Sequence, residues 1–213
     1  LCHHSKLDIR DRRRISLLET RPGISDHRAY VRPRRADRGD QPPIGANFRS
    51  LLCYNLHFMY PKGNLLIPAS HGQLEAILKE PAAKRRGVGL VCHPHPLGGG
   101  TMHNKVVFRA AAGLIDAGLL TLRFNFRSVG ASTGVHSEIE GGKEDVRTAL
   151  DYLAGEYPGE DITLAGFSFG SRVGMEVGMS DDRVRRLISI GTPVEKYRDY
   201  DFLTAVAKPI LFI

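Results

Sequence analysis

Residues 164 to 178 read LAGFSFGSRVGMEVG, with the pattern Gly-x-Ser-x-Gly centred on Ser168. An apolar stretch precedes the pattern, and a helix-like segment follows it, which places Ser168 at a predicted strand-to-helix junction. A serine at such a junction has a strained backbone and a hydroxyl pushed out of the sheet, and Gly166 and Gly170 leave room for this tight turn. The pattern therefore predicts a nucleophile at Ser168. The alternative is a serine that only caps the helix.

Strand-like and helix-like segments alternate along the chain from residue 64. A hairpin comes first, with its turn at His71-Gly72. Apolar strands are expected at 87–92, 119–126, 161–166, 184–190 and 208–213, and helices at 105–118, 142–155 and 168–178. This alternation predicts an α/β protein with a mostly parallel sheet and helices on both faces. In such sheets the chemistry gathers at the carboxyl ends of the strands.

Each predicted helix has one face that is expected to lie on the sheet. The residues at helical spacing are Val106, Ala110 and Leu114 in the first helix, and Val146, Leu150 and Leu153 in the second. The third helix repeats glycine at 170, 174 and 178, which predicts a close approach to the sheet.

The charge and apolar content of the chain limit its class. The 213 residues are 42% apolar with no run long enough to cross a bilayer, which favours one domain without a membrane partner. Of the net charge of +7, residues 1–50 carry +6. We expect residues 1–58 to be a disordered basic arm or a non-native extension, with Met59 near the true start, and residues 59–213 to be the α/β domain. The arm lacks the aromatic interleaving of a nucleic-acid binder, so no nucleic-acid partner is expected.

The three cysteines, Cys2, Cys53 and Cys92, are widely spaced. They suggest neither a disulfide framework nor a zinc knuckle, and they fit a reducing, cytoplasmic location. Cys92 lies in an apolar run and is expected to pack as a small buried hydrophobic residue.

The turn HPHPLGGG, residues 93–100, follows the first buried strand. An acyl-transfer enzyme needs two backbone N–H donors for an oxyanion, one of them from the residue after the nucleophile, here Phe169. The two prolines of the turn have no N–H, so His95 or Leu97 must supply the second donor. We favour Leu97.

Two other interpretations of this turn were weighed. A phosphate-binding loop needs glycine before Lys105 and Ser or Thr after it, and neither is present. A metal site from His93, His95 and His103 is conceivable, but the prolines stiffen the turn and no carboxylate lies beside it. No metal and no cofactor are therefore expected.

A second turn, RSVGASTG, begins at Arg127, which is expected to anchor the turn through carbonyls or a carboxylate rather than to contact substrate. Acidic residues follow near a predicted helix start, where a solvated role beside the helix dipole suffices for them: Glu138, Glu140, Glu144 and Asp145.

Three motifs, in order, are HPHPLGGGTMHNKVV, LRFNFRSVGASTG and LAGFSFGSRV. Together they resemble the small bacterial proteins of the α/β-hydrolase superfamily that are related to dienelactone hydrolase, over residues 63 to 213. The resemblance implies a cytosolic serine hydrolase that cleaves an ester, thioester or similar acyl bond of a small molecule through Ser168. One departure is Ser128, where such proteins usually carry glycine after the arginine.

The residues that would activate Ser168 are not evident in the chain. In this fold the order is Ser, then Asp or Glu, then His, and all nine histidines precede Ser168. We expect the acid and the base beyond Ile213, in a longer product that also supplies the last strand and helix. Asp199 or Asp201 as acid and His95 as an improvised base are the in-chain alternatives.

On this expectation the fragment alone is incomplete or inactive as a hydrolase. The competing hypothesis is an α/β-hydrolase-fold protein without catalysis that binds a ligand or a partner.

Overall fold

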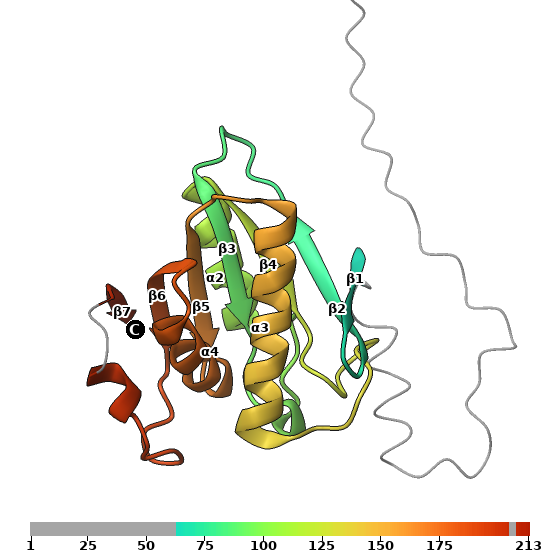
Figure 1. Cartoon of the computed structure of the whole chain (residues 1–213), viewed down its shortest axis with the longest axis vertical. Helices are drawn as coiled ribbons and strands as arrows, with labels where there is room; N and C mark the ends of the chain where they lie inside the picture. The colour runs from blue at the N-terminus through green and yellow to red at the C-terminus, as the bar shows by residue number, and fades with distance from the viewer. Residues whose placement is uncertain (1–62, 205–207) are drawn as a thin grey trace, which may run out of the picture. The chain divides into compact units, whose positions relative to one another are not determined.

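A seven-stranded sheet forms the centre of the computed structural model, which describes residues 63–204 and 208–213 (Figure 1). Its strands are β1 Leu65–Ala69, β2 Gly72–Lys79, β3 Gly87–Cys92, β4 Leu119–Phe124, β5 Ile162–Phe167, β6 Val184–Ile190 and β7 Ile210–Phe212. They are ordered β1-β2-β4-β3-β5-β6-β7. β1, β2 and β4 pair antiparallel, and the remaining neighbours pair parallel. The predicted mostly parallel sheet is confirmed.

Some predictions fall on residues that the structure does not describe. The domain boundary at Met59, the basic arm, Cys2 and Cys53 all lie outside the described residues. Cys92 is described and is fully buried, as predicted, and burial raises the pKa of its thiol.

The β1–β2 hairpin closes through a two-residue turn. Ala69 pairs with Gly72, so the turn consists of Ser70 and His71, one residue earlier than predicted. The glycine belongs to the strand instead, where its φ of +120° suits a residue without a side chain.

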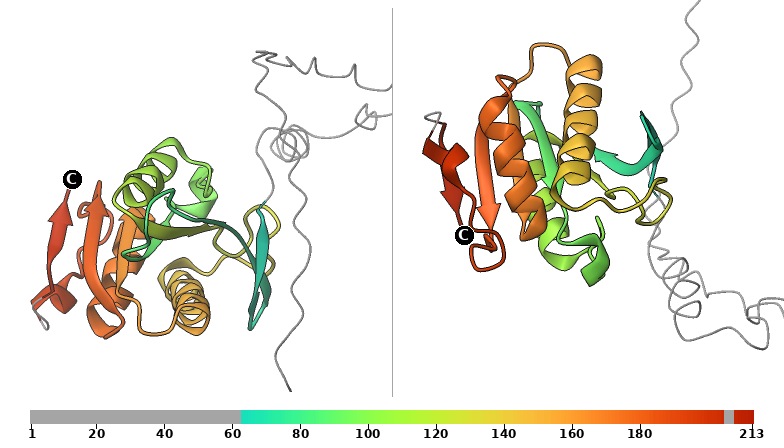
Figure 2. Two further views of the ribbon diagram at one scale, coloured as in Figure 1. Left: turned by 90° about the horizontal axis from the view of Figure 1, so that it is seen from above. Right: turned by 60° about the horizontal axis from the view of Figure 1, so that its bottom comes forward.

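Helices cover both faces of the sheet, as predicted. Figure 2 shows α2, Lys105–Asp116, on one face and α3, Glu138–Glu156, with α4, Phe169–Ser180, on the other. Two apolar clusters correspond to the two faces. The larger joins α3 and α4 to the sheet, and the smaller lies under α2. The central parallel strands β3 and β5 are therefore buried on both sides, which accounts for their largely apolar sequences.

The apolar stripe of α2 differs from the predicted one. Val107, Ala111 and Leu114 are buried, whereas Val106 and Ala110 are only partly covered. Apolar residues occupy both sets of positions, so the helix has two overlapping stripes, and its orientation on the sheet decides between them. In α3, the predicted stripe of Val146, Leu150 and Leu153 is confirmed.

Helix α3 starts at Glu138, four residues before the predicted start. Two glycines in its first turns obscured this start, because glycine is a poor helix former. Both are required by packing. A Cβ at Gly142 would lie 2.8 Å from the Phe169 ring, and one at Gly141 would lie 3.1 Å from the Arg127 guanidinium.

The glycine face of α4 lies against the sheet. A Cβ at Gly170 would be 2.5 Å from the Cys92 carbonyl oxygen, and Cβ atoms at Gly174 and Gly178 would each be 2.6 Å from a leucine side chain of the sheet. The predicted close approach is confirmed, and it holds the start of α4 beside the end of β3.

No helix in residues 63–204 or 208–213 combines the length and the apolar character needed to span a bilayer.

Candidate active site

Ser168 stands between the end of β5 and the start of α4, with φ 52° and ψ −116°. This conformation is strained for a residue with a side chain. Its N–H donates to the Ile190 carbonyl at 2.9 Å, which fixes the backbone to β6. The side chain is half-buried and makes no cap hydrogen bond, so Ser168 does not cap the helix with its hydroxyl.

The glycines on either side of Ser168 make its turn possible. A Cβ at Gly166 would lie 2.3 Å from the Gly170 carbonyl oxygen, and a Cβ at Gly170 would meet the carbonyl oxygens of Cys92 and His93 at 2.5 Å. The turn is therefore as tight as the sequence pattern predicts.

The turn after β3 is organised around His95. The His95 carbonyl accepts hydrogen bonds from the N–H groups of Gly98 and Gly100, both at 3.0 Å. The His95 Nδ1 accepts a third from Leu97 N–H at 3.2 Å, at the start of the short helix η1, Pro96–Gly98. The N–H predicted as the second oxyanion donor is thus hydrogen-bonded to an imidazole, while the Leu97 side chain is 72% exposed.

His93 is a structural residue. Its Nε2 accepts a hydrogen bond from Phe126 N–H at 3.0 Å, and its Nδ1 lies 2.6 Å from the Pro94 carbonyl oxygen, which places the ring proton on Nδ1. Burial lowers the pKa of His93 to about 3, against the opposing effect of the Pro94 hydrogen bond. Both ring nitrogens are used, so His93 joins the ends of β3 and β4 and is neither a base nor a metal ligand.

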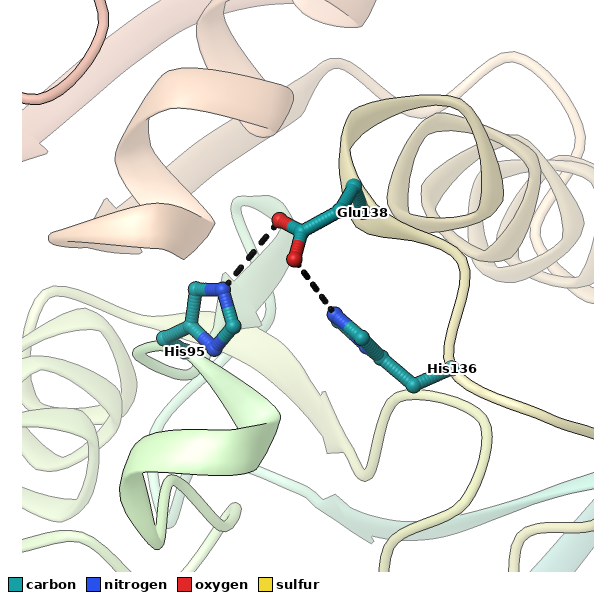
Figure 3. A group of neighbouring side chains, drawn as sticks. All are labelled: His95, His136 and Glu138. Atoms are coloured by element: carbon teal, nitrogen blue, oxygen red, sulfur yellow. Dashed lines mark hydrogen bonds and ion pairs between the residues drawn. The ribbon is translucent and has the colours of Figure 1, made fainter.

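A cluster of two histidines and a glutamate lies beside the start of α4 (Figure 3). His95 Nε2 is 3.3 Å from Glu138 Oε2, and His136 Nε2 is 3.5 Å from Glu138 Oε1. Both imidazoles pack against the Phe169 ring, with centroid distances of 5.0 Å for His95 and 6.3 Å for His136. The histidine set weighed from the sequence, His93 with His95 and His103, does not form this cluster.

The carboxylate of this cluster is held in its charged form. Burial is the largest single influence on the pKa of the Glu138 carboxyl and raises it, but the hydrogen bond to His95 and the charges of His95 and His136 together outweigh burial. The pKa therefore lies below its usual value. Sequence reasoning missed His136, which belongs to no recognisable motif. The solvated role expected for Glu138 agrees with the exposure of its side chain, but its contacts with the two histidines were not foreseen.

Arg127 anchors its turn through carboxylates, as predicted. Its Nε and Nη2 donate to Asp145 Oδ1 at 3.0 and 2.8 Å, and its backbone N–H donates to Asp145 Oδ2 at 2.8 Å. The exposed Glu144 accepts a further bond from Nη2. The solvated role predicted for Asp145 is wrong, because Asp145 is 0% exposed and also contacts His71 Nε2 at 3.0 Å.

Ser128 has a φ of +67°, the left-handed conformation that glycine adopts without strain. The departure noted in the sequence thus lies where the backbone favours glycine. The serine is exposed, so its side chain has room, and the turn keeps its shape at the cost of backbone strain.

The two in-chain candidates for the acid lie on the segment after β6. Asp199 borders a hollow of about 470 Å³ that Arg172 and Lys143 also line. Asp201 is exposed at the start of the short helix η2, Asp201–Thr204. Neither of these carboxylates, nor His95, forms a hydrogen bond with Ser168 in the part of the chain that the structure describes.

The chain is similar to several known proteins. It is 36% identical over 140 residues to an uncharacterized protein of Rickettsia prowazekii, a match that covers 65% of this chain and 59% of that protein. The chain therefore spans less than two thirds of the length of this curated relative. No family model matches the chain.

Solved structures give a closer comparison. An α/β serine hydrolase homologue from Coxiella burnetii is 40% identical, with a TM-score of 0.64, over 72% of this chain and 74% of that one. An α/β serine hydrolase without a lid from Xanthomonas campestris is 33% identical, also with a TM-score of 0.64, over 72% and 70%. The narrower relation to dienelactone hydrolase stays a prediction. Both the sequence identity and the shared fold lead to one conclusion: the chain belongs to the α/β serine hydrolase family.

Proposed function

We propose that the chain carries the nucleophile and the oxyanion donors of a serine hydrolase that acts on ester, thioester or related acyl bonds. The observation that carries the proposal is the strained backbone of Ser168, which stands at the end of β5 with a hydroxyl that makes no cap hydrogen bond. Strain at one residue persists only where its surroundings enforce it, and it is common at catalytic positions.

The proposed reaction passes through an acyl-enzyme. Ser168 Oγ bonds to the carbonyl carbon, its proton passes to a general base, and the carbonyl oxygen becomes an oxyanion. Collapse of this intermediate breaks the bond to the alcohol or thiol, which leaves with a proton. Water then hydrolyses the acyl-serine. The N-terminus of α4 favours the negative charge, and Phe169 N–H is the first donor to it.

We assign Leu97 N–H as the second oxyanion donor. In the free protein this N–H donates to His95 Nδ1, so the assignment requires the imidazole to release it when substrate binds. Among the described residues no histidine or carboxylate is hydrogen-bonded to Ser168, and we therefore assign only the nucleophile and the two donors.

A small or exposed acyl compound is the proposed substrate class. The lidless relative from Xanthomonas campestris supports it, since a site without a lid is open to solvent. Specificity in such a site rests on the turns around the serine rather than on an enclosing segment.

A fluorophosphonate probe tests the proposal, because it reacts covalently with activated serines. Because the proposal assigns only the nucleophile and the oxyanion donors, we expect slow labelling. Peptide mass spectrometry after long exposure to the probe should find the phosphonyl group on Ser168, and Ser168→Ala should abolish it. Ser180→Ala, at the far end of the same helix, is the matched control and should label like the parent. Folded parent protein that stays unlabelled would contradict the assignment.

That contrary result would favour the second candidate, a hydrolase-fold protein that binds a ligand or partner without catalysis. The absence of a hydrogen-bonded base at Ser168 in the described part of the chain is the observation in its favour.

A further inference from the structure

The side chains of His95, His136 and Glu138 converge from two separate turns and the start of a helix (Figure 3). His95 belongs to the turn after β3, while His136 lies just before α3 and Glu138 is the first residue of α3. One potential ligand atom from each residue lies within 4.8 Å of the other two. The fold thus brings together three metal-binding groups that are 43 residues apart in the sequence at their widest.

The spacing of these atoms fits one small cation. Around tetrahedral zinc, with bonds of about 2.0–2.1 Å, neighbouring ligand atoms are about 3.4 Å apart. The two observed contacts to the Glu138 carboxylate are close to this distance, at 3.3 Å from His95 to Oε2 and 3.5 Å from His136 to Oε1. They run to different oxygens, so the carboxylate and the rings must turn to place one atom of each residue on the ion. Glu138 is 63% exposed on its side chain, so it can rotate to complete the site without disturbing the core.

The histidine nitrogens are not fully used by the protein. His136 Nε2 is buried and, among the described residues, has no partner with hydrogen-bond geometry; its only contact of this kind is the 3.5 Å ion pair with Glu138. A buried polar nitrogen without a hydrogen bond is costly, and a cation between the rings would relieve that cost. The side chain of His95 is also largely covered, at 19% exposure.

The donor set indicates the class of ion. Two imidazoles and one carboxylate suit borderline divalent ions such as Zn²⁺, and they suit the oxygen-seeking Mg²⁺ and Ca²⁺ poorly. Three protein ligands leave at least one coordination position for water or another ligand. The exposed side of Glu138 faces solvent and gives the ion a route of entry.

We propose that His95, His136 and Glu138 bind one divalent transition-metal ion, Zn²⁺ in the first instance, beside the Phe169 ring. The bound ion joins the turn after β3 to the start of α3, two segments that otherwise meet through side chains. The contacts that support this site do not depend on the function proposed for Ser168. The competing interpretation is a hydrogen-bonded His–Glu–His cluster that needs no ion.

The test uses full-chain protein stripped with a chelator and titrated with Zn²⁺ by calorimetry and with Co²⁺ by visible absorption. We expect one ion per chain at this site, a tetrahedral Co²⁺ spectrum, and a rise in the melting temperature with metal. His136→Asn and Glu138→Gln should each weaken binding at least about tenfold and remove the melting shift.

Glu140→Gln is the matched control, because Glu140 is an exposed carboxylate in the same first turn of α3 that lies outside the cluster. It should bind metal like the parent. Thermal melting of each metal-free variant shows whether it is folded. Glu138→Gln retains a hydrogen-bonding amide, so its melting temperature should be near that of the parent. Zinc that other histidines of the chain take up would be bound by the parent and by both cluster variants alike. The proposal is overturned if neither cluster variant binds metal more weakly than the parent, or if the folded parent binds none.

Discussion

The Arg127 guanidinium donates twice to a single oxygen of Asp145, and the carboxylate of Asp145 is completely buried. Removing one member of a buried ion pair leaves the other charge uncompensated. We expect Asp145→Asn to lower the free energy of unfolding by about 3–5 kcal/mol in urea denaturation. Glu144→Gln removes only the exposed partner of the same arginine and should cost less than about 1 kcal/mol. Equal losses for the two variants would mean that burial of the pair is unimportant.

The glycine at position 170 is predicted to be irreplaceable. In Gly170→Ala the new Cβ would lie 2.5 Å from the carbonyl oxygens of Cys92, the last residue of β3, and of His93, so α4 must move away. We expect a loss of about 1–3 kcal/mol in unfolding free energy and reduced probe labelling of Ser168. Gly113→Ala is the control, because a Cβ at this helical position meets nothing within 4 Å. Gly113→Ala should stabilise the protein by about 0.5–1 kcal/mol. If it destabilised the protein as much as Gly170→Ala does, the loss at position 170 could not be assigned to the close contact with β3.

Replacement of Ser128 by glycine should relieve backbone strain. The left-handed φ of +67° costs a serine about 1–2 kcal/mol, and the extra freedom of glycine in the unfolded chain offsets about 0.4–1 kcal/mol of the gain. We therefore expect Ser128→Gly to leave the melting temperature unchanged or to raise it by a few degrees. Ser137→Gly, at a φ of −141°, relieves no strain and should lower it. A similar fall in the melting temperature of both variants would contradict the assignment of backbone strain to Ser128.

Glu75 is predicted to contribute to the pH dependence of stability. Burial raises the pKa of its carboxyl, but hydrogen bonds from the N–H groups of Ala131 and Gly63 and from the Asn125 amide outweigh burial and hold the pKa below its usual value. The folded state thus binds the proton more weakly than the unfolded state, whose pKa is about 4.3. This stabilisation is present above pH 4.3 or so and is lost as the pH falls through the folded-state pKa.

The check compares Glu75→Gln with the parent by urea denaturation between pH 7 and pH 3. The variant should be less stable by about 1–3 kcal/mol at neutral pH, since an amide cannot accept all three bonds. The difference should narrow as the pH falls. Glu195→Gln, at an exposed position, should follow the parent throughout. If the difference in unfolding free energy between Glu75→Gln and the parent stayed constant across this pH range, protonation of Glu75 would not contribute to the pH dependence of stability.

The sequence predicted the elements of this fold well because β3 and β5 are largely apolar runs between clear breaks, and most of β2 alternates apolar with polar residues. β3 was predicted at residues 87–92, and that is where it lies. The errors arose where packing between elements decides. Sequence periodicity could not choose between the overlapping apolar stripes of α2. Gly141 and Gly142 hid the start of α3, because glycine is required there by close packing against Arg127 and Phe169, which the sequence does not show.

The candidate site was predictable only in part, because some of its residues are brought together by packing between distant segments. The tight turn at Ser168 follows from two glycines within five residues, which is local information. The burial of Asp145 and the meeting of His136 with His95 depend on how two turns approach each other in space. No spacing along the chain reports such an approach, so Asp145 was assigned to solvent and His136 was passed over.

The two ring nitrogens of His95 have different partners, so the ring couples ligand binding at Nε2 to the hydrogen bond that Leu97 N–H makes with Nδ1. A neutral imidazole has one ring proton, and because Nδ1 accepts from Leu97 N–H, that proton is on Nε2, facing Glu138. A ligand that takes the Nε2 lone pair shifts the proton to Nδ1, and the Leu97 N–H then loses its acceptor. By reciprocity, an anion that captures the Leu97 N–H strengthens binding at Nε2. Two events on opposite edges of a single ring can thus influence each other through the position of one proton, without any displacement of the backbone.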